Sequence, residues 1–434
     1  MTGIITLLIA LSAQIGFLFY QLTTKKSQTR VKHIIRITAF AMFSLLLVAG
    51  VYWWGIHWMG LFIMLSILAI FSVIYFIRWS KVEKEFKRLS AVLSCISGCI
   101  LLTLCILPGI LFPQFEAVAS TGSYAVNTAN VTFVDTSRTD PFSEKGENRK
   151  LTVQFWYPNV DEGSDTFPLA VFSHGSFGYR GSNLSTFEDL ASNGYVVCSI
   201  DHSYHAFFAQ HTDGSTTLVN TEFLDDAVNI TNDALDEQTT YTKTHEWLAL
   251  RASDMDFVLE KILNNVNDEI PESVYSIINT GKIGLFGHSL GGATAAYLGR
   301  ERIDVDSVIV IDGTMIGEEI GFENGKGILN MEPYPVPLLN LYNDSHYEDA
   351  YKAGTAYNNI SASTQAIEAY DVVIRGSGHL NFTDLPLFSP ILARMLGTGD
   401  VDSRYCIETM NQIVLDFFNY TLKDVGTPNM QMEY

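Results

Sequence analysis

The sequence predicts an α/β domain, with a mostly parallel sheet between helices, that follows four membrane-spanning helices. Three observations lead to this prediction. Four apolar runs occupy the first 112 positions, and short strand-like runs alternate with helix-like segments from about residue 131 onwards. A serine flanked by glycines, at position 289, joins one of these strand-like runs to a helix-like run.

The four apolar runs are each about twenty residues long, the length that an α-helix needs to cross the hydrocarbon core of a bilayer. No acidic residue lies inside any of them, and they are too long and too apolar for surface helices. The first run could instead be a signal peptide, but it lacks a basic leading segment and a clear cleavage site. The runs are Gly3–Leu22, Ile34–Gly55, Trp58–Trp79 and Ala91–Phe112.

The distribution of charge predicts how these helices are oriented. Residues 1–112 hold ten basic and two acidic residues, whereas the remainder holds 17 basic and 45 acidic ones. The basic residues lie in the links between the first and second runs and between the third and fourth, which should therefore face the cytoplasm. We expect a multi-pass cell-membrane protein with both ends outside, so that the domain after residue 112 is extracytoplasmic. Trp53, Trp54, Trp58 and Trp79 lie near the run ends, as interfacial anchors do.

The function of the membrane region is expected to be anchoring. Acidic and basic side chains are absent from the runs except near their ends, whereas conduits carry such groups along their pathway. The acidic remainder would repel phosphates and is a poor nucleic-acid binder. The predicted organisation is an anchor at 1–112, a linker at 113–130 and a catalytic domain at 131–434.

Strands alternate with helices in the second part, which indicates a parallel sheet covered on both faces. The acidic segment 204–244 interrupts the pattern and is either a lid or a disordered loop. Strands are predicted at 131–135, 151–157, 168–173, 195–200, 282–286, 306–311, 336–342 and 370–375, and helices at 181–193, 245–264, 289–301 and 404–423.

The stretch "KIGLFGHSLGGATAAYL", residues 282–298, carries the strongest chemical pattern. A buried strand, a turn of about three residues and a helix with a small-residue face surround Ser289. Gly287 and Gly291 flank the serine where a Cβ would collide. This G-x-S-x-G pattern is the nucleophile elbow of the α/β-hydrolase fold, which exposes the hydroxyl at a helix N-terminus. An N-cap serine in a glycine-rich turn is the alternative interpretation.

A serine nucleophile needs a base and an orienting acid, which follow it along the chain in this fold. Only His346 and His379 follow Ser289. His379 is the predicted base, because it lies in a small-residue loop after one of the last strands. Asp312 and Asp344 each end a strand and compete as the acid; Gly313 favours Asp312, but the residues alone leave both open.

The oxyanion hole requires two backbone N–H groups that face the developing charge. Leu290, the residue after the nucleophile, should supply one. The segment "VFSHGSFG", residues 171–178, resembles an esterase oxyanion loop and should supply the other. Ser176 is the first choice and Phe177 the second, and a plain glycine turn is the alternative.

Several ordered motifs resemble one family, the plasma-type platelet-activating-factor acetylhydrolases of the isoform II group, with their bacterial membrane-anchored relatives. They are "DTSRTDPF", "LTVQFWYP", "VFSHGSFG", "LASNGYVVCSIDH", "GLFGHSLGGAT", "VIVIDGTM" and "VIRGSGHLNF". The resemblance covers nearly all of residues 130–423. It implies Ser289 as nucleophile, Asp312 as acid, His379 as base, and Leu290 and Ser176 as oxyanion donors.

The resemblance also implies an activity, the calcium-independent hydrolysis of short or oxidised acyl esters of phospholipids, with no cofactor and no metal. The serine at 176, the extra residue at 177, the segment 204–244 and the membrane helices depart from the family pattern. We therefore expect a membrane-anchored serine esterase that acts on lipid or small-molecule esters. An acyltransferase with the same triad and a non-catalytic receptor are the alternatives.

Overall fold

The computed structural model describes residues 2–78, 85–161, 165–265, 269–428 and 430–434. The chain divides into two compact units, one of Met1–Glu116 with Leu387–Leu392 and one of Ala117–Pro386 with Ala393–Tyr434. Each unit is described by itself below.

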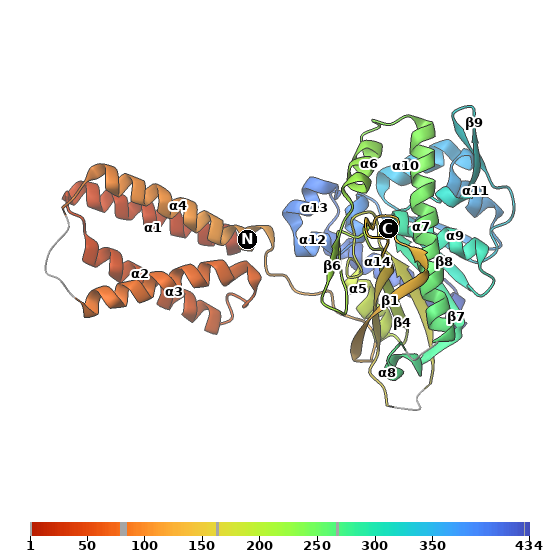
Figure 1. Ribbon diagram of the computed structural model, residues 1–434, viewed down its shortest axis with the longest axis horizontal. Helices are drawn as coiled ribbons and strands as arrows, with labels where there is room; N and C mark the ends of the chain where they lie inside the picture. Colours follow the sequence, from red (N-terminus) through yellow and green to blue (C-terminus); the bar gives the residue numbers. More distant parts are fainter. Residues whose placement is uncertain (1, 79–84, 162–164, 266–268, 429) are drawn as a thin grey trace. The chain divides into compact units, whose positions relative to one another are not determined.

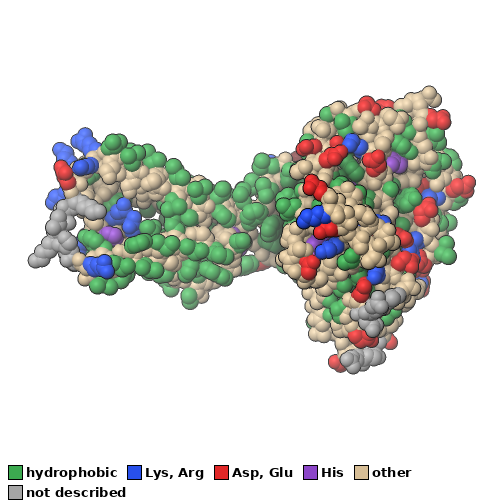
Figure 2. Space-filling view, in the orientation of Figure 1, with side chains coloured by type: hydrophobic (Ala, Val, Ile, Leu, Met, Phe, Trp, Pro, Cys, Tyr) green, Lys and Arg blue, Asp and Glu red, His purple; other side chains and the backbone are tan. Residues whose placement is uncertain are grey.

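The first unit contains four helices that are long and apolar enough to cross a membrane. Hydrophobic side chains cover the sides of this helical unit, and Lys and Arg side chains gather at one end of it (Figure 2). Such a surface suits surroundings of hydrocarbon along the sides. The helices are α1 (Thr2–Thr24), α2 (Thr29–Val48), α3 (Ile56–Ile77) and α4 (Arg88–Leu111).

Two details differ from the sequence-based expectations. Helix α2 begins five residues before the predicted apolar run and ends at Val48, because its polar first turns are helical and Gly50 adopts a positive φ of 72°. Trp58 is buried against Phe43 and Tyr52 inside the helical unit, so its ring contacts protein. Trp53 and Trp54 are exposed, and Trp79 lies outside the described residues.

The second unit is built on an eight-stranded sheet with the strand order β1-β2-β4-β3-β7-β8-β11-β12. The pairs β1·β2 and β2·β4 are antiparallel, and all other neighbours are parallel. The strands are β1 (Val126–Thr139), β2 (Asn148–Pro158), β3 (Phe167–Ser173), β4 (Val196–Asp201), β7 (Ile278–His288), β8 (Ser307–Ile311), β11 (Leu338–Tyr342) and β12 (Ala369–Val373).

Helices cover both faces of this sheet (Figure 1). Leu169 and Val171 of β3 face a core cluster that contains residues of α7 (Glu237–Asn264) and α9 (Leu290–Glu301). Ala170 and Phe172 face the opposite cluster, with α5 (Leu184–Ser192) and α14 (Ser403–Lys423). Every residue of β3 is buried, which explains why its sequence reads as a continuous apolar run. The predicted mostly parallel sheet with helices on both faces is therefore confirmed.

Shorter elements lie between these strands and helices. They are β5 (Phe208–Gln210), β6 (Thr216–Leu218), α6 (Thr221–Thr231), α8 (Glu272–Tyr275), η2 (Ile316–Glu318), β9 (Glu319–Glu323), β10 (Lys326–Leu329), α10 (Asp344–Ala353), η3 (Gly354–Ala356), α11 (Asn358–Gln365), η4 (His379–Phe382), α12 (Leu385–Phe388) and α13 (Pro390–Leu396). Of these, α12 and α13 include residues of Leu387–Leu392, which belongs to the first unit.

Two predicted boundaries change. Strand β1 begins at Val126, so the last five residues of the predicted linker 113–130 belong to the sheet, where Val126 and Ala129 are partly buried against the core. The segment 204–244 is folded as β5, β6, α6 and the first turns of α7, so it is not a disordered loop. Its role as a lid stays a prediction.

Helix α14 should contribute strongly to stability through Phe418, which is buried against Phe286 and Tyr195. We expect Phe418→Ala to lower the free energy of unfolding by about 3–5 kcal/mol, because it leaves a cavity in the core. The matched control is Tyr405→Ala on the same helix, whose side chain is exposed; it should change stability by about 0.5 kcal/mol or less. Denaturant titration of the detergent-solubilised chain measures both, and equal effects would contradict this packing.

Candidate active site

Ser289 lies between the end of β7 and the start of α9, in a strained backbone conformation. Its φ is 55° and its ψ is −125°, a region that residues with a side chain rarely occupy. Two glycines permit the sharp turn. A Cβ on Gly287 would lie 2.3 Å from the backbone of Gly291, and a Cβ on Gly291 would lie 1.9 Å from the carbonyl oxygen of Ser173. At both predicted elbow glycines, a side chain would collide with backbone atoms, so only glycine fits there.

Asp312 lies directly after β8, the strand next to β7, and its carboxylate accepts four hydrogen bonds. The Nδ1 atoms of His379 and His346 lie 2.6 and 2.8 Å from its two oxygens. The backbone N–H and the side-chain amide of Asn343 donate at 2.8 and 2.6 Å. Burial raises the pKa of this carboxyl, but the hydrogen bonds from both histidines outweigh burial and hold the pKa well below its usual range. Asp312 is therefore an anion that can orient an imidazole.

The two histidines that bind Asp312 through Nδ1 differ in whether their second ring nitrogen, Nε2, has a partner inside the protein. His346 Nε2 lies 2.6 Å from the hydroxyl of Tyr357, so both of its nitrogens have partners inside the protein. His379 has 42% of its side chain exposed, compared with 14% for His346. With Nδ1 bonded to Asp312, His379 keeps Nε2 for substrate chemistry. The geometry favours His379 as the base and gives His346 a supporting role.

His379 lies close to the elbow that carries Ser289. The ring of His288, the residue before the serine, packs on the ring of His379 with centroids 4.5 Å apart, and its Nε2 lies 3.1 Å from the carbonyl oxygen of His379. A Cβ on Gly313, the residue after Asp312, would lie 2.3 Å from the carbonyl oxygen of Ser289. The predicted nucleophile, acid and base thus follow the carboxyl ends of β7, β8 and β12, parallel strands of one sheet, and a hydrogen bond joins the acid to the base.

Asp344, the alternative acid, lies outside this cluster. Its carboxylate pairs with Arg375 at 2.8 Å and accepts from the backbone of Gly376 at 3.1 Å. It is also the first residue of α10, and 42% of its side chain is exposed. Asp344 therefore stabilises the ends of α10 and β12, and the structure brings only Asp312 to His379.

The predicted oxyanion loop forms a turn immediately after β3. The N–H of Gly178 donates to the carbonyl of Gly175 at 3.1 Å, and Phe177 takes a positive φ of 61°. A Cβ on Gly175 would lie 3.2 Å from the Cβ of Ser289, so the loop abuts the serine. In the described part of the chain, the N–H groups of Ser176, Phe177 and Leu290 donate no hydrogen bond to the protein. They are therefore available to an oxyanion.

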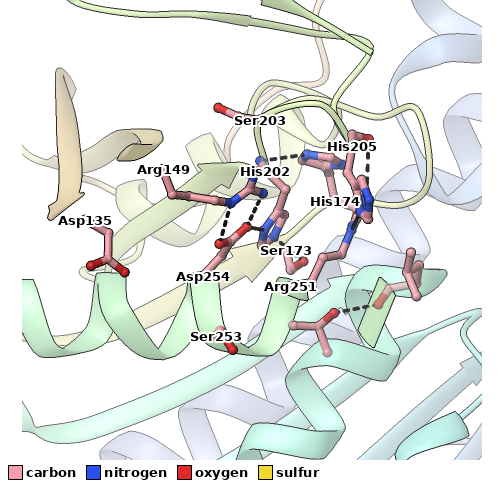
Figure 3. Close-up of polar contacts among 12 residues, drawn as sticks. Asp135, Arg149, Ser173, His174, His202, Ser203, His205, Arg251, Ser253 and Asp254 are labelled. Carbon is pink, nitrogen blue, oxygen red and sulfur yellow. Dashed lines mark hydrogen bonds and ion pairs between the residues drawn. The ribbon is translucent and has the colours of Figure 1, made fainter. Parts of the chain in front are cut away.

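A network of buried charged residues beneath the loop was not predicted from the sequence (Figure 3). Arg149 and Asp254 are both fully buried and form a bidentate pair, with contacts of 2.9 and 2.7 Å. Arg149 also reaches Asp140, and His202 connects Asp254 to Ser173. Nearby, the guanidinium of Arg251 approaches His174 and His205.

One sequence pattern could have indicated this network. The segment "DTSRTDPF", used above only as a family motif, supplies Asp135, Arg138 and Asp140. Arg138 pairs with Asp135 at 2.5 Å and with Asp254 at 3.1 Å. The partners Arg149 and Asp254 are 105 residues apart, so spacing along the chain carries no information about their contact.

Comparison with known proteins identifies the family of the chain. The sequence model of "Platelet-activating factor acetylhydrolase, isoform II" matches residues 152–432. The chain belongs to this family. The match confirms the predicted resemblance.

Individual relatives are more distant. The platelet-activating factor acetylhydrolase of Bos taurus is 27% identical over 291 residues, which cover 61% of this chain and 59% of that protein. The enzyme of Canis lupus familiaris is 25% identical over 268 residues, with coverages of 58% and 56%. The chain thus spans less than two thirds of the length of these curated relatives.

Among solved structures, a ferulic acid esterase from Streptomyces cinnamoneus superimposes with a TM-score of 0.55 at 23% identity, covering 73% of this chain and 95% of that one. At this identity the likeness concerns the fold alone, and it confirms the predicted α/β-hydrolase fold. Among the described residues, no group of three or more His, Cys, Asp and Glu side chains could hold a metal ion.

The two histidines on Asp312 should respond differently to substitution in this acetylhydrolase-family site. We expect His379→Ala to lower kcat by about 10⁴-fold or more, because the base is lost. His346→Phe should lower kcat by only about 10-fold, because Asp312 keeps three other donors. Hydrolysis of p-nitrophenyl acetate by the solubilised chain measures both. A larger loss in His346→Phe than in His379→Ala would reverse the assignment.

Of the five histidines buried in the described chain, the four with the largest downward pKa shifts should make the catalytic unit sensitive to acid. Burial is the main cause that lowers the pKa of each, to about 4 for His202 and about 3 for His288. Unfolded imidazoles take up protons below about pH 6.5, so the unfolded state gains protons that the folded state excludes, and stability falls with falling pH. The four are His174, His202, His205 and His288.

Two buried carboxyls oppose this effect in part. Burial raises the pKa of Asp201 and of Asp384 to about 6, so each favours the folded state as pH falls from about 6 towards 4. Together these groups take up about two protons on unfolding in that window. The free energy of unfolding therefore falls by about 3 kcal/mol for each pH unit of acidification. We expect the thermal midpoint of the solubilised chain to drop by roughly 5 °C between pH 6 and pH 5. A midpoint that stays constant or rises would contradict these buried neutral histidines.

Proposed function

We propose that this chain is a membrane-anchored serine hydrolase of carboxylic esters. One observation supports the proposal most strongly: the Asp312–His379 hydrogen bond lies beside Ser289, which occupies a strained turn between β7 and α9. Family membership points to the same class of reaction.

The reaction follows from the positions of the site groups. Ser289 Oγ attacks the ester carbonyl carbon, while His379 Nε2 accepts the hydroxyl proton and later returns it to the leaving alcohol. Asp312 holds the imidazole with Nδ1–H towards itself and stabilises the imidazolium. The N–H groups of Leu290 and of Ser176, with Phe177 as the second choice, stabilise the oxyanion. Water activated by His379 then releases the acid and restores Ser289.

The substrate class is proposed from the relatives and from the membrane anchor. The curated relatives are named platelet-activating factor acetylhydrolases. We therefore propose short-chain or oxidised acyl esters of the phospholipid type as substrates. The four apolar helices would keep the catalytic unit beside an amphiphilic substrate, and the chemistry needs no cofactor.

The nucleophile is tested with Ser289→Ala in the full chain. The parent chain should hydrolyse p-nitrophenyl acetate and react with a fluorophosphonate probe, and the variant should lose labelling and at least about 10⁴-fold of kcat. Esters of increasing acyl length then test the substrate class, with the highest kcat/KM expected for acetyl to butyryl chains. Labelling that persists in Ser289→Ala would exclude this serine as the nucleophile.

The orientation is tested with single cysteines and a membrane-impermeant maleimide on intact cells. Asp213 lies at an exposed site of the catalytic unit, and Lys26 lies in the basic link after α1. Each is replaced by cysteine in a separate variant. We expect labelling of Asp213→Cys from outside and labelling of Lys26→Cys only after lysis. The parent chain, with its own five cysteines, is the control. The reverse pattern would place the catalytic unit in the cytoplasm.

A further inference from the structure

Arg251 lies on α7 and is fully buried. Its guanidinium binds backbone carbonyl oxygens of the predicted oxyanion loop. Its Nη1 donates to the carbonyl oxygen of His174, and its Nη2 lies 3.3 Å from the carbonyl oxygen of Gly175. The remaining donors reach His205, at 3.3 Å from its carbonyl oxygen and 3.4 Å from its Nδ1. In the described part of the chain, no carboxylate forms an ion pair with Arg251.

This arrangement is unusual for a buried arginine, because a buried charge is normally compensated by an opposite charge. The neighbouring Arg149 follows that rule, since it pairs with Asp254 and Asp140. Burial lowers the pKa of Arg251 to about 9, so the group is still protonated at neutral pH. The protein therefore tolerates a costly cation at this place, and each of its three nitrogens contacts a loop carbonyl or His205.

The geometry of the peptide group links these carbonyls to the reaction. In a trans peptide the C=O of one residue and the N–H of the next are coplanar and point in opposite directions. A guanidinium that holds the carbonyl of Gly175 therefore fixes the direction of the N–H of Ser176. The Gly178 N–H and His174 Nδ1 hold the same carbonyl at 3.1 and 2.6 Å, so Arg251 is one of three donors that determine the orientation of this one peptide.

The peptide that Arg251 holds is in contact with the nucleophile. A Cβ on Gly175 would lie 3.2 Å from the Cβ of Ser289, so any rotation of the loop changes the backbone groups that face the serine. The Ser176 N–H has no partner among the described residues, and Ser176 is the predicted oxyanion donor.

Helix α6, in the segment 204–244, supports this arrangement from another side. The ring of Phe223 stacks on His205, with centroids 3.9 Å apart and planes 6° from parallel, and it also packs against Phe177 at 5.3 Å. Trp247 of α7 packs on Phe223 at 4.8 Å. His205 is thereby held where it can accept from Arg251, and Phe177 is held in its positive-φ conformation.

We propose that Arg251 is a positioning residue for the oxyanion hole: by binding the His174 and Gly175 carbonyls, it directs the Ser176 N–H at the oxyanion. This inference rests on the proposed function of Ser289. It assigns to a residue of α7, remote in sequence from the elbow, a role in stabilising the transition state. The positive charge beside the loop also favours the anion that forms there.

The test compares Arg251→Met and Arg251→Lys with a matched control, Arg149→Lys, in the full chain. Arg149 is buried in the same network but contacts no carbonyl of the oxyanion loop. We expect Arg251→Met to lower kcat by about 100-fold with KM changed by less than about 3-fold, because removal of one oxyanion donor has effects of this size. Arg251→Lys keeps the positive charge and one donor nitrogen, so its kcat should be about 10-fold higher than that of Arg251→Met. Arg149→Lys should lower the thermal midpoint but keep kcat within about 3-fold.

A second readout separates positioning from general damage to the fold. Affinity for a trifluoromethyl ketone, which forms a tetrahedral oxyanion on Ser289, should fall in parallel with kcat/KM across the series. Affinity for the product alcohol, which forms no oxyanion, should stay constant. The inference is wrong if Arg251→Met keeps its kcat, if only KM rises, or if Arg149→Lys loses as much kcat as Arg251→Met at equal folded fraction. An inactive parent chain that no fluorophosphonate labels would overturn the proposed function, and this inference with it.

Discussion

The close approach of two backbones is the constraint on which the site depends. The first turn of α9 packs so tightly on the end of β3 that a Cβ on Gly291 would lie 1.9 Å from the carbonyl oxygen of Ser173. Because the parallel register places β7 beside β3, this contact brings the serine elbow and the loop after β3 together. The free N–H groups and the orientation of Ser289 both require that the backbones of α9 and β3 lie this close together.

Backbone strain occurs at three residues where the chemistry is expected. Ser289, Asp312 and Phe177 all have positive φ values, of 55°, 49° and 61°, although none is a glycine. Such conformations persist only when surrounding contacts hold them. Here the contacts are the hydrogen bond from the Ser289 N–H to Ile311, the hydrogen bonds to the Asp312 carboxylate and the packing of Phe177 on Phe223. The sheet thus stabilises local conformations that the residues would not adopt alone.

Buried charge plays a comparable role on the other side of the loop. The Arg149–Asp254 pair joins β2 to α7, and Arg251, one turn earlier on α7, binds the loop carbonyls. Breaking such a buried pair is costly because it leaves an uncompensated charge. The pair therefore stabilises the packing of α7 on the sheet, whereas the contacts of Arg251 itself hold the loop. The segment "DTSRTDPF" contributes to the same network through Arg138 and Asp140.

The sequence by itself determined the class of fold, the apolar helices, the strand order along the chain and the elbow at Ser289, because these depend on local periodicity and on glycine stereochemistry. It also placed Asp312, His379 and the loop around Ser176 at strand ends, where parallel strands bring residues together. Only the tertiary structure distinguished Asp312 from Asp344 by contact with His379, folded the segment 204–244, and brought Arg251 to Gly175. Those outcomes depend on contacts between residues far apart in the chain, such as the 76 positions between Gly175 and Arg251. Hydrophobic patterning does not encode such contacts, because a buried arginine interrupts an apolar pattern in the same way whichever partner it meets.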